Sequence, residues 1–84
     1  MDPMAIQVRC FAGAAAIVGG PSVTVTLAVR SKISQLREAM IAQFPELATL
    51  ARQSRWAVAN DFVSDQFELL PSMTVAMIPP VSGG

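Results

Sequence analysis

The spacing of the hydrophobic residues changes after residues 30–32, from a strand pattern to a helix pattern, and this change limits the folds that the sequence can form. Apolar and polar residues alternate over 6–10 and again over 23–29, as they do in strands with one buried face. Further along, apolar residues recur at spacings of three and four, which place them on one side of a helix: Ile33, Leu36, Met40 and Phe44. Two strands followed by a helix and more strands predict an α+β fold.

The remaining elements follow from local patterns. Ser31 is the expected N-cap of the main helix, and Pro45 ends that helix. The sequence also predicts a helical turn at 14–18, a second helix at 46–55 and short strands at 56–60, 62–63 and 74–78. We therefore expect one domain over 1–78, with a mixed sheet packed against one main helix, and an extended tail over 79–84.

The composition excludes most kinds of side-chain catalysis. The 84 residues include no histidine and one cysteine, so neither a Cys/His zinc site nor a Ser-His-Asp triad nor an internal disulfide can form. Six acids balance six bases, and a net charge of zero gives no electrostatic footprint for nucleic acid. We expect a protein that is not catalytic alone and that holds no metal.

Charged residues are scarce, at 14% against roughly 25% in an ordinary domain. Hydrophobic residues reach 52%, so part of the apolar surface is expected to stay exposed and to meet a protein partner. A bias toward alanine, which tolerates exposure, is the alternative explanation.

The chain carries no charge between Arg9 and Arg30, which raises the question of a membrane span. Gly19, Gly20 and Pro21 would interrupt a spanning helix, and the second half of the stretch alternates with period two. The acidic start lacks the basic region of a secretory signal. We expect a soluble, cytoplasmic protein that does not contact a membrane.

Three groups of side chains are candidates for chemistry. Cys10 lies on the inward face of the first predicted strand, so a buried structural thiol is expected. Asp61 and Asp65 have no third acid at ligand spacing and are interpreted as solvated loop residues. Arg52 and Arg55, three residues apart on the predicted second helix, fit a charged surface face better than an anion site.

The end of the chain is the most informative segment. Two prolines stiffen its base, and the last two residues have no side chain: Pro79, Pro80, Val81, Ser82, Gly83 and Gly84. A rigid domain would thus present a slim terminal carboxylate that fits a narrow channel. A carboxylate resists attack until it is activated, so this reading implies a nucleotide-using partner; an unimportant disordered tail is the alternative.

This tail resembles the C-terminus of the small subunits of molybdopterin synthases, a family of ubiquitin-like sulfur carriers. Weaker similarities to the family lie at 11–12, 33–36 and 57–63. The chain departs from the family at 70–74, where many relatives have an acidic turn that contains glycine.

The resemblance implies a β-grasp fold and a role in molybdenum cofactor biosynthesis. In the family the terminal glycine, here Gly84, is adenylated and then converted to a thiocarboxylate, whose sulfur is transferred to cyclic pyranopterin monophosphate. Gly83 would permit insertion, and 79–82 would fill the channel of the large subunit. Phe62 and Ile78 match the family's hydrophobic contact surface, although ordinary core packing is an equal alternative for both.

The resemblance also implies partners. These are the large subunit, in a heterotetramer, an adenylyltransferase related to ubiquitin-activating enzymes, and a sulfur donor protein. No cofactor would be bound permanently, because the activating enzyme uses the ATP. Three alternatives remain: a carrier for thiamin or cysteine synthesis, a ubiquitin-like modifier of lysines, or a plain interaction domain without terminal chemistry.

Overall fold

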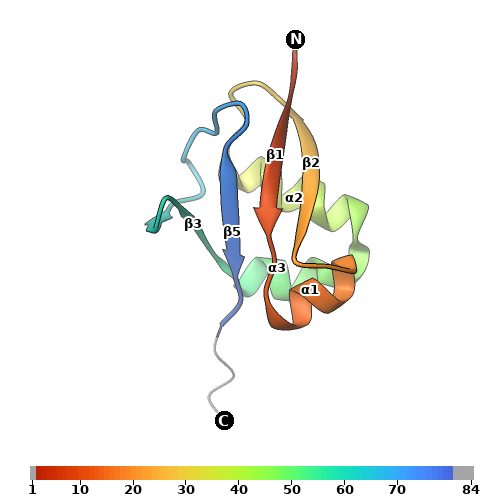
Figure 1. The fold of residues 1–84 in the computed structure, drawn as a ribbon. Coiled ribbons are helices and arrows are strands. Elements are labelled where there is room, and N and C mark those ends of the chain that lie inside the picture. Colours follow the sequence, from red (N-terminus) through yellow and green to blue (C-terminus); the bar gives the residue numbers. More distant parts are fainter. Residues whose placement is uncertain (1, 81–84) are drawn as a thin grey trace.

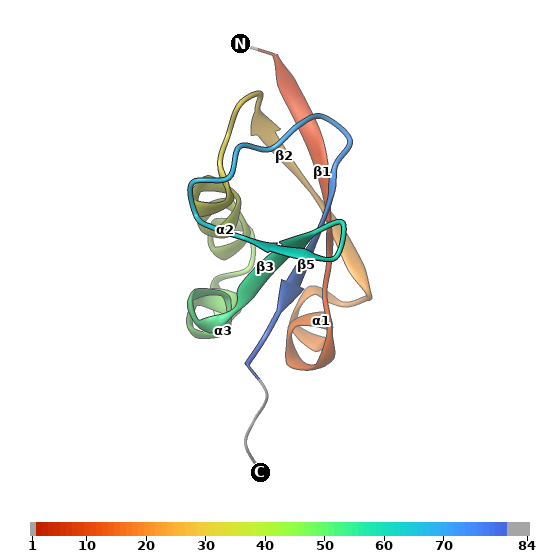
Figure 2. The same ribbon diagram turned by 90° about the vertical axis from the view of Figure 1, so that its left-hand side faces the viewer.

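Five strands form one mixed sheet in the computed structural model, which describes residues 2–80 (Figures 1 and 2). The strand order is β2-β1-β5-β3-β4, with β5 in the middle and parallel to β1, while the other neighbours are antiparallel. The strands are β1 (Pro3–Arg9), β2 (Ser22–Ala28), β3 (Arg55–Val58), β4 (Asp61–Val63) and β5 (Thr74–Ile78). The predicted mixed sheet is confirmed.

The longest helix packs under this sheet, as predicted. The helical segments are α1 (Ala12–Val18), α2 (Ile33–Gln43), the 3₁₀ turn η1 (Pro45–Leu47) and α3 (Ala48–Gln53). Figure 2 shows α2 and α3 on one face of the sheet, and α1 lies at the end where β5 finishes. The apolar stripe of α2 is fully buried at Ile33, Leu36 and Met40.

The N-cap prediction for α2 is wrong by one residue. Lys32, not Ser31, occupies the N-cap, and its backbone N–H donates to Gln35 Oε1 at 2.8 Å. Ser31 is buried instead, and its carbonyl accepts a hydrogen bond from the Leu69 N–H at 2.8 Å. The first N–H groups of α2 are instead satisfied from the segment between β4 and β5: Ile33 donates to the Phe67 carbonyl and Ser34 to the Asp65 carbonyl, each at 3.1 Å.

The core lies between the sheet and α2. Ile6, Val8 and Cys10 are buried as their alternation predicts. Because β1 begins three residues earlier than expected, at Pro3, Met4 joins the same buried face. On β2, Val25 is buried and residues 23 and 27 are half-buried against the core on the same predicted face. Val29, which the prediction includes in this strand, follows the end of β2, and it too is half-buried against the core.

Several predicted boundaries need correction. The second helix ends at Gln53 rather than 55, because the Ser54 N–H turns back to the Ala51 carbonyl at 3.3 Å. The third strand spans Arg55–Val58 rather than 56–60. Ala59 and Asn60 both have a positive φ and make the two-residue turn into β4, so neither can continue the strand.

Among the described residues, no helix is long and apolar enough to cross a membrane. The chain leaves the sheet from its middle strand, since Pro79 and Pro80 follow β5 directly. The rest of the predicted tail, 81–84, lies outside the described residues.

Candidate functional site

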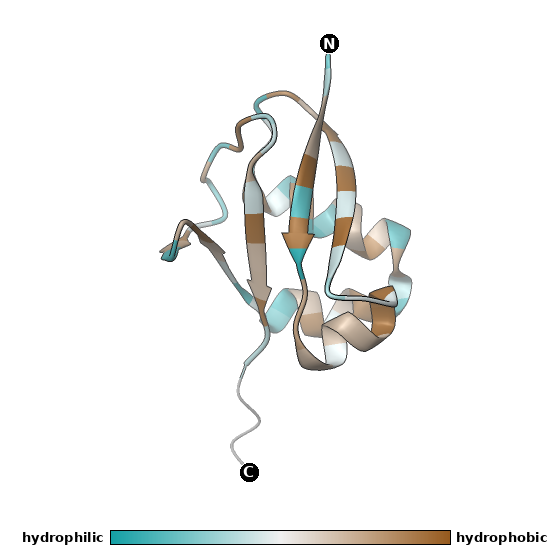
Figure 3. Ribbon diagram, in the orientation of Figure 1, coloured by the Kyte–Doolittle hydropathy of each residue, from teal (hydrophilic) through white to brown (hydrophobic). Residues whose placement is uncertain are grey.

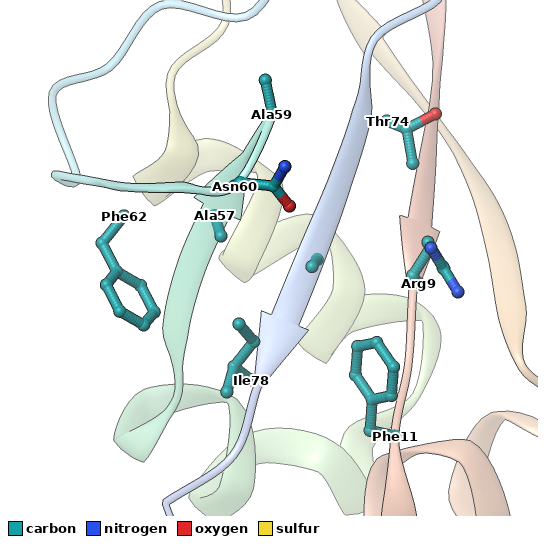
Figure 4. Close-up of a pocket in the computed structure, with 9 residues that line it drawn as sticks. Arg9, Phe11, Ala57, Ala59, Asn60, Phe62, Thr74 and Ile78 are labelled. Carbon is teal, nitrogen blue, oxygen red and sulfur yellow. The ribbon is translucent and has the colours of Figure 1, made fainter.

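An open groove of about 460 Å³ lies on the sheet face opposite α2, along β5 (Figure 4). Figure 4 shows Phe62 on one side of the groove and Phe11 with Arg9 on the other, with Ala57 and Ile78 between them. The groove is lined by Arg9, Phe11, Ala57, Ala59, Asn60, Phe62, Thr74, Ala76 and Ile78.

The strand register creates the hollow. Arg9 is paired with Ala76, Ala76 with Ala57, and Ala57 with Phe62, so these residues form one row across four strands. Residues directly opposite each other in a sheet point to the same face. The methyl groups of the two alanines thus lie between the large side chains of Arg9 and Phe62, so the middle of the row is lower than its ends.

Phe62 forms an exposed apolar wall of the groove. Its relative exposure is 53%, although a large aromatic side chain is usually covered. The guanidinium of Arg55 lies 3.6 Å from the ring centroid, a cation–π contact that holds the ring against the sheet. Arg55 is also paired with Ile78 in the strand register, so the three residues form one continuous surface.

Phe11 makes the opposite wall and is 42% exposed. The guanidinium of Arg9 lies 5.7 Å from its ring centroid. Among the described residues that line the groove, Arg9 alone is charged, so this apolar surface carries a positive edge. Such a surface, with small residues in its floor and aromatic rings in its walls, suits a protein partner.

The structure brings two predicted site residues, Phe62 and Ile78, to the same groove. The core-packing alternative is wrong for Phe62, and Ile78 is half-buried outside the hydrophobic core. Of the predicted tail, Pro79 and Pro80 directly follow this surface. Val81, Ser82, Gly83 and Gly84 are site predictions that lie outside the described residues.

Sequence reasoning missed the groove roles of Arg9, Phe11 and Asn60. These residues become neighbours of Ile78 only because β5 inserts between β1 and β3. The alternation in the first strand was the one sequence signal for these groove residues. It places Arg9 on the exposed, polar face of the sheet but does not show which residues lie beside it.

The single thiol is structural, as predicted. Cys10 is 3% exposed, and burial raises the pKa of its thiol. A raised pKa leaves little thiolate at neutral pH, and the thiolate is the nucleophile. Cys10 therefore contributes to the core and offers no chemistry to the groove.

The aspartate and arginine candidates are not brought together as sites. Asp65 is ion-paired rather than freely solvated, because Arg37 donates to both carboxylate oxygens at 2.8 Å and thereby lowers the pKa of Asp65. Asp61 begins β4 and is exposed. At the surface, Arg52 Nη2 lies 3.4 Å from Glu38 Oε1. Arg55 belongs to β3, so the two arginines do not share one helix.

The fold closely matches solved structures of ubiquitin-like proteins. The small archaeal modifier protein SAMP1 from Haloferax volcanii superposes with a TM-score of 0.80 at 19% identity and covers 95% of this chain and 99% of its own. A ubiquitin from Caldiarchaeum subterraneum gives a TM-score of 0.67 at 16% identity, with 99% and 100% covered. The mixed sheet around α2 is therefore a ubiquitin-like β-grasp fold, as expected.

Sequence comparison identifies the family. The pattern of the ThiS family matches residues 8–84, and the chain belongs to this family. A human relative named molybdopterin synthase sulfur carrier subunit is 35% identical over 82 residues, or 94% of this chain and 93% of the relative. A relative of the same name from Caenorhabditis briggsae is 29% identical over 83 residues, with 96% and 99% covered.

Proposed function

We propose that this chain is the sulfur carrier subunit of a molybdopterin synthase and carries its sulfur on the C-terminal Gly84. The observation that supports this most is the 35% identity to the human sulfur carrier subunit over nearly the whole of both chains. The Gly83-Gly84 terminus is the second support, because it supplies an unhindered carboxylate. The chain itself is not an enzyme and serves as the sulfur-donating part of a sulfurtransferase complex.

The proposed chemistry exchanges one oxygen of the Gly84 carboxylate for sulfur. An activating enzyme related to ubiquitin-activating enzymes joins the carboxylate to AMP, and pyrophosphate leaves from ATP. Sulfur at the oxidation level of sulfide, supplied by a donor protein, attacks the carbonyl carbon, and AMP departs with its oxygen. The resulting thiocarboxylate gives its sulfur to cyclic pyranopterin monophosphate. The chain needs no bound cofactor or metal for these steps.

The groove supplies the docking surface in this proposal. Phe62 and Ile78 would pack against the large subunit, and Pro79 and Pro80 would direct the tail into its channel. Ile78 is both a groove residue and the last residue of β5, so docking the groove fixes the point where the tail begins. Fixing that point lowers the entropy cost of inserting the tail. A heterotetramer of two carriers and two large subunits is the expected assembly.

Deletion of Gly84 tests the terminal chemistry. The full chain, incubated with its activating enzyme, ATP and sulfur donor, should gain the mass of one sulfur-for-oxygen exchange. The deletion variant should gain none, while its far-ultraviolet circular dichroism stays unchanged because the deleted residue lies beyond β5. Glu46→Gln, an exposed change in η1, is the matched control and should be converted like the parent. Equal conversion of the deletion variant would refute the role of Gly84.

The pathway is tested separately by the acceptor. The thiocarboxylate form, mixed with the large subunit and cyclic pyranopterin monophosphate, should return to the carboxylate as the pterin gains sulfur. A carrier for thiamin or cysteine synthesis would keep its sulfur under these conditions. A modifier would instead form branched conjugates with lysines of cellular proteins.

A further inference from the structure

The two edge strands of the sheet, β4 and β2, differ in how well they are protected against pairing with a strand of another molecule. β4 is three residues long and begins with Asp61, and short, charged edges resist pairing with another strand. β2 has seven residues, and neither a charge nor a proline interrupts it: Ser22, Val23, Thr24, Val25, Thr26, Leu27 and Ala28. This edge lacks the usual devices that prevent strand addition.

The hydrogen-bond ladder leaves one side of β2 unpaired. At its two ends, the Cys10 N–H donates to the Pro21 carbonyl at 2.8 Å and the Val29 N–H donates to the Asp2 carbonyl at 3.1 Å. An antiparallel ladder alternates along each strand, so the odd-numbered residues of β2 bond to β1. The backbone groups of Thr24 and Thr26 therefore point away from the sheet. No hydrogen bond from another part of residues 2–80 reaches them.

The sequence of β2 reads nearly the same from both ends. In an antiparallel pair of two copies centred on Val25, the opposed positions are 22 with 28, 23 with 27, 24 with 26, and 25 with 25. Threonine thus faces threonine on the outer side of the sheet, and valine faces leucine on the core side. Threonine pairs and apolar pairs both stabilise neighbouring strands. This register pairs all seven residues, and a shift by two would pair fewer.

The core side of β2 has apolar surface left to cover. Val23 and Leu27 are only half-buried, although they belong to the face that packs on the core. Figure 3 shows this alternation as bands along β2. A second copy would place its own Leu27 and Val23 opposite them. Neither like charges within β2 nor a net molecular charge, which is zero, would repel that copy.

From these observations we propose that β2 pairs with β2 of a second copy of this chain, which joins two five-stranded sheets into one. The outward groups of Thr24 and Thr26 would form about four hydrogen bonds with the second copy. A single strand pair covers less than the roughly 1,000 Å² typical of a stable interface, so the dimer forms only at high concentration. The groove extends from β1 to β4 on the outer face of the sheet and includes no residue of β2, so it stays free in both copies.

A pair of double variants tests this register. Thr24→Lys with Thr26→Lys opposes like charges at both positions, whereas Thr24→Lys with Thr26→Glu opposes unlike charges. Both threonines are exposed, so the fold should persist in either variant, with the buried Trp56 reporting it by fluorescence. Sedimentation of the full-length chain at low ionic strength, up to about 1 mM protein, measures the dimer.

The wild type should approach twice the monomer mass, the Lys/Lys variant should associate at least tenfold more weakly, and the Lys/Glu variant should dimerise at least as well as the wild type. A wild type that remains monomeric throughout would overturn the proposal. It would also be overturned if the Lys/Lys variant dimerised normally, or if both variants lost the dimer. None of these outcomes bears on sulfur transfer by Gly84.

Discussion

At the scale of single residues, the backbone at Ser72 carries a local conformational cost. Its φ is 64°, in the left-handed region that residues with a Cβ seldom adopt. The Met73 N–H donates to the Leu70 carbonyl at 3.2 Å across Pro71 and Ser72. Proline followed by a positive φ is typical of a type II turn, whose third position favours glycine.

Replacing Ser72 by glycine should therefore stabilise the protein. We expect Ser72→Gly to raise the free energy of unfolding by up to about 1 kcal/mol, because glycine avoids the left-handed penalty. The neighbouring bonds to β1, from the Ser72 N–H to the Ala5 carbonyl and from the Gln7 N–H to the Met73 carbonyl, use only backbone atoms and should remain. Urea unfolding followed by Trp56 fluorescence measures the change.

The same exchange in extended backbone provides the control. Ser22→Gly, at the exposed start of β2, should lower stability by about 0.5 to 1 kcal/mol, because glycine loses more backbone entropy in a strand. If Ser72→Gly destabilised the chain as much as Ser22→Gly, the left-handed turn would not be present in solution.

At the scale of elements, the segment between β4 and β5 fastens the start of α2. The backbone N–H groups of Ile33 and Ser34 donate to the carbonyls of Phe67 and Asp65, each at 3.1 Å. These bonds satisfy donors at the helix N-terminus that usually need a capping side chain. The bidentate pair between Arg37 and Asp65 reinforces the same junction.

Removing the charge of Asp65 should destabilise this junction in a pH-dependent way. The folded-state pKa of Asp65 is lowered, so the pair adds stability above the ordinary aspartate pKa of about 3.9 and loses it as the pH falls through the folded-state value. We expect Asp65→Asn to reduce the free energy of unfolding at pH 7 by no more than about 1 kcal/mol, since Asp65 is half exposed and water screens the pair.

Denaturant unfolding at pH 7 and at successively lower pH measures this difference, which should shrink in acid. Asp61→Asn is the control, because this exposed residue starts β4 rather than the segment beside α2. If the stability lost in Asp65→Asn were the same at every pH tested, the ion pair with Arg37 would not be its cause.

Local periodicity predicted the elements better than their ends. The alternation in β1 and the stripe of α2 were sufficient, because each depends on one buried face. The start of α2 and the end of β3 depend on other features, namely the bonds to the β4–β5 segment and the positive φ of Ala59 and Asn60. The groove could not be derived locally, since its row from Arg9 to Phe62 requires the strand order.

At the scale of the whole molecule, the two faces of the sheet have different roles. One face holds the core with α2, whereas the outer face carries the groove and leads into Pro79. The chain contains no histidine and its one thiol is buried, so the proposed function places the reacting group at the C-terminal carboxylate rather than on a side chain. In this proposal, the ThiS-family β-grasp domain serves to position that terminus.

Substitution of Phe62 should separate partner binding from folding. We expect Phe62→Ala to weaken binding to the large subunit at least tenfold, because an exposed aromatic anchor held by Arg55 is lost. Stability should change little, since the ring is 53% exposed. Leu70→Ala is the matched control, as Leu70 is 58% exposed and does not line the groove. Titration calorimetry measures both; equal affinities of the two variants would exclude the groove as the docking surface.

Sulfur transfer by Gly84 is tested most directly by the intact mass of this chain, purified from cells with an active pathway, before and after mixing with the large subunit and cyclic pyranopterin monophosphate. We expect a sulfur-for-oxygen exchange located on Gly84 before mixing and its reversal afterwards. A chain that never carries this sulfur in the presence of activating enzyme and sulfur donor, or that keeps it after mixing, would not be the sulfur carrier of a molybdopterin synthase.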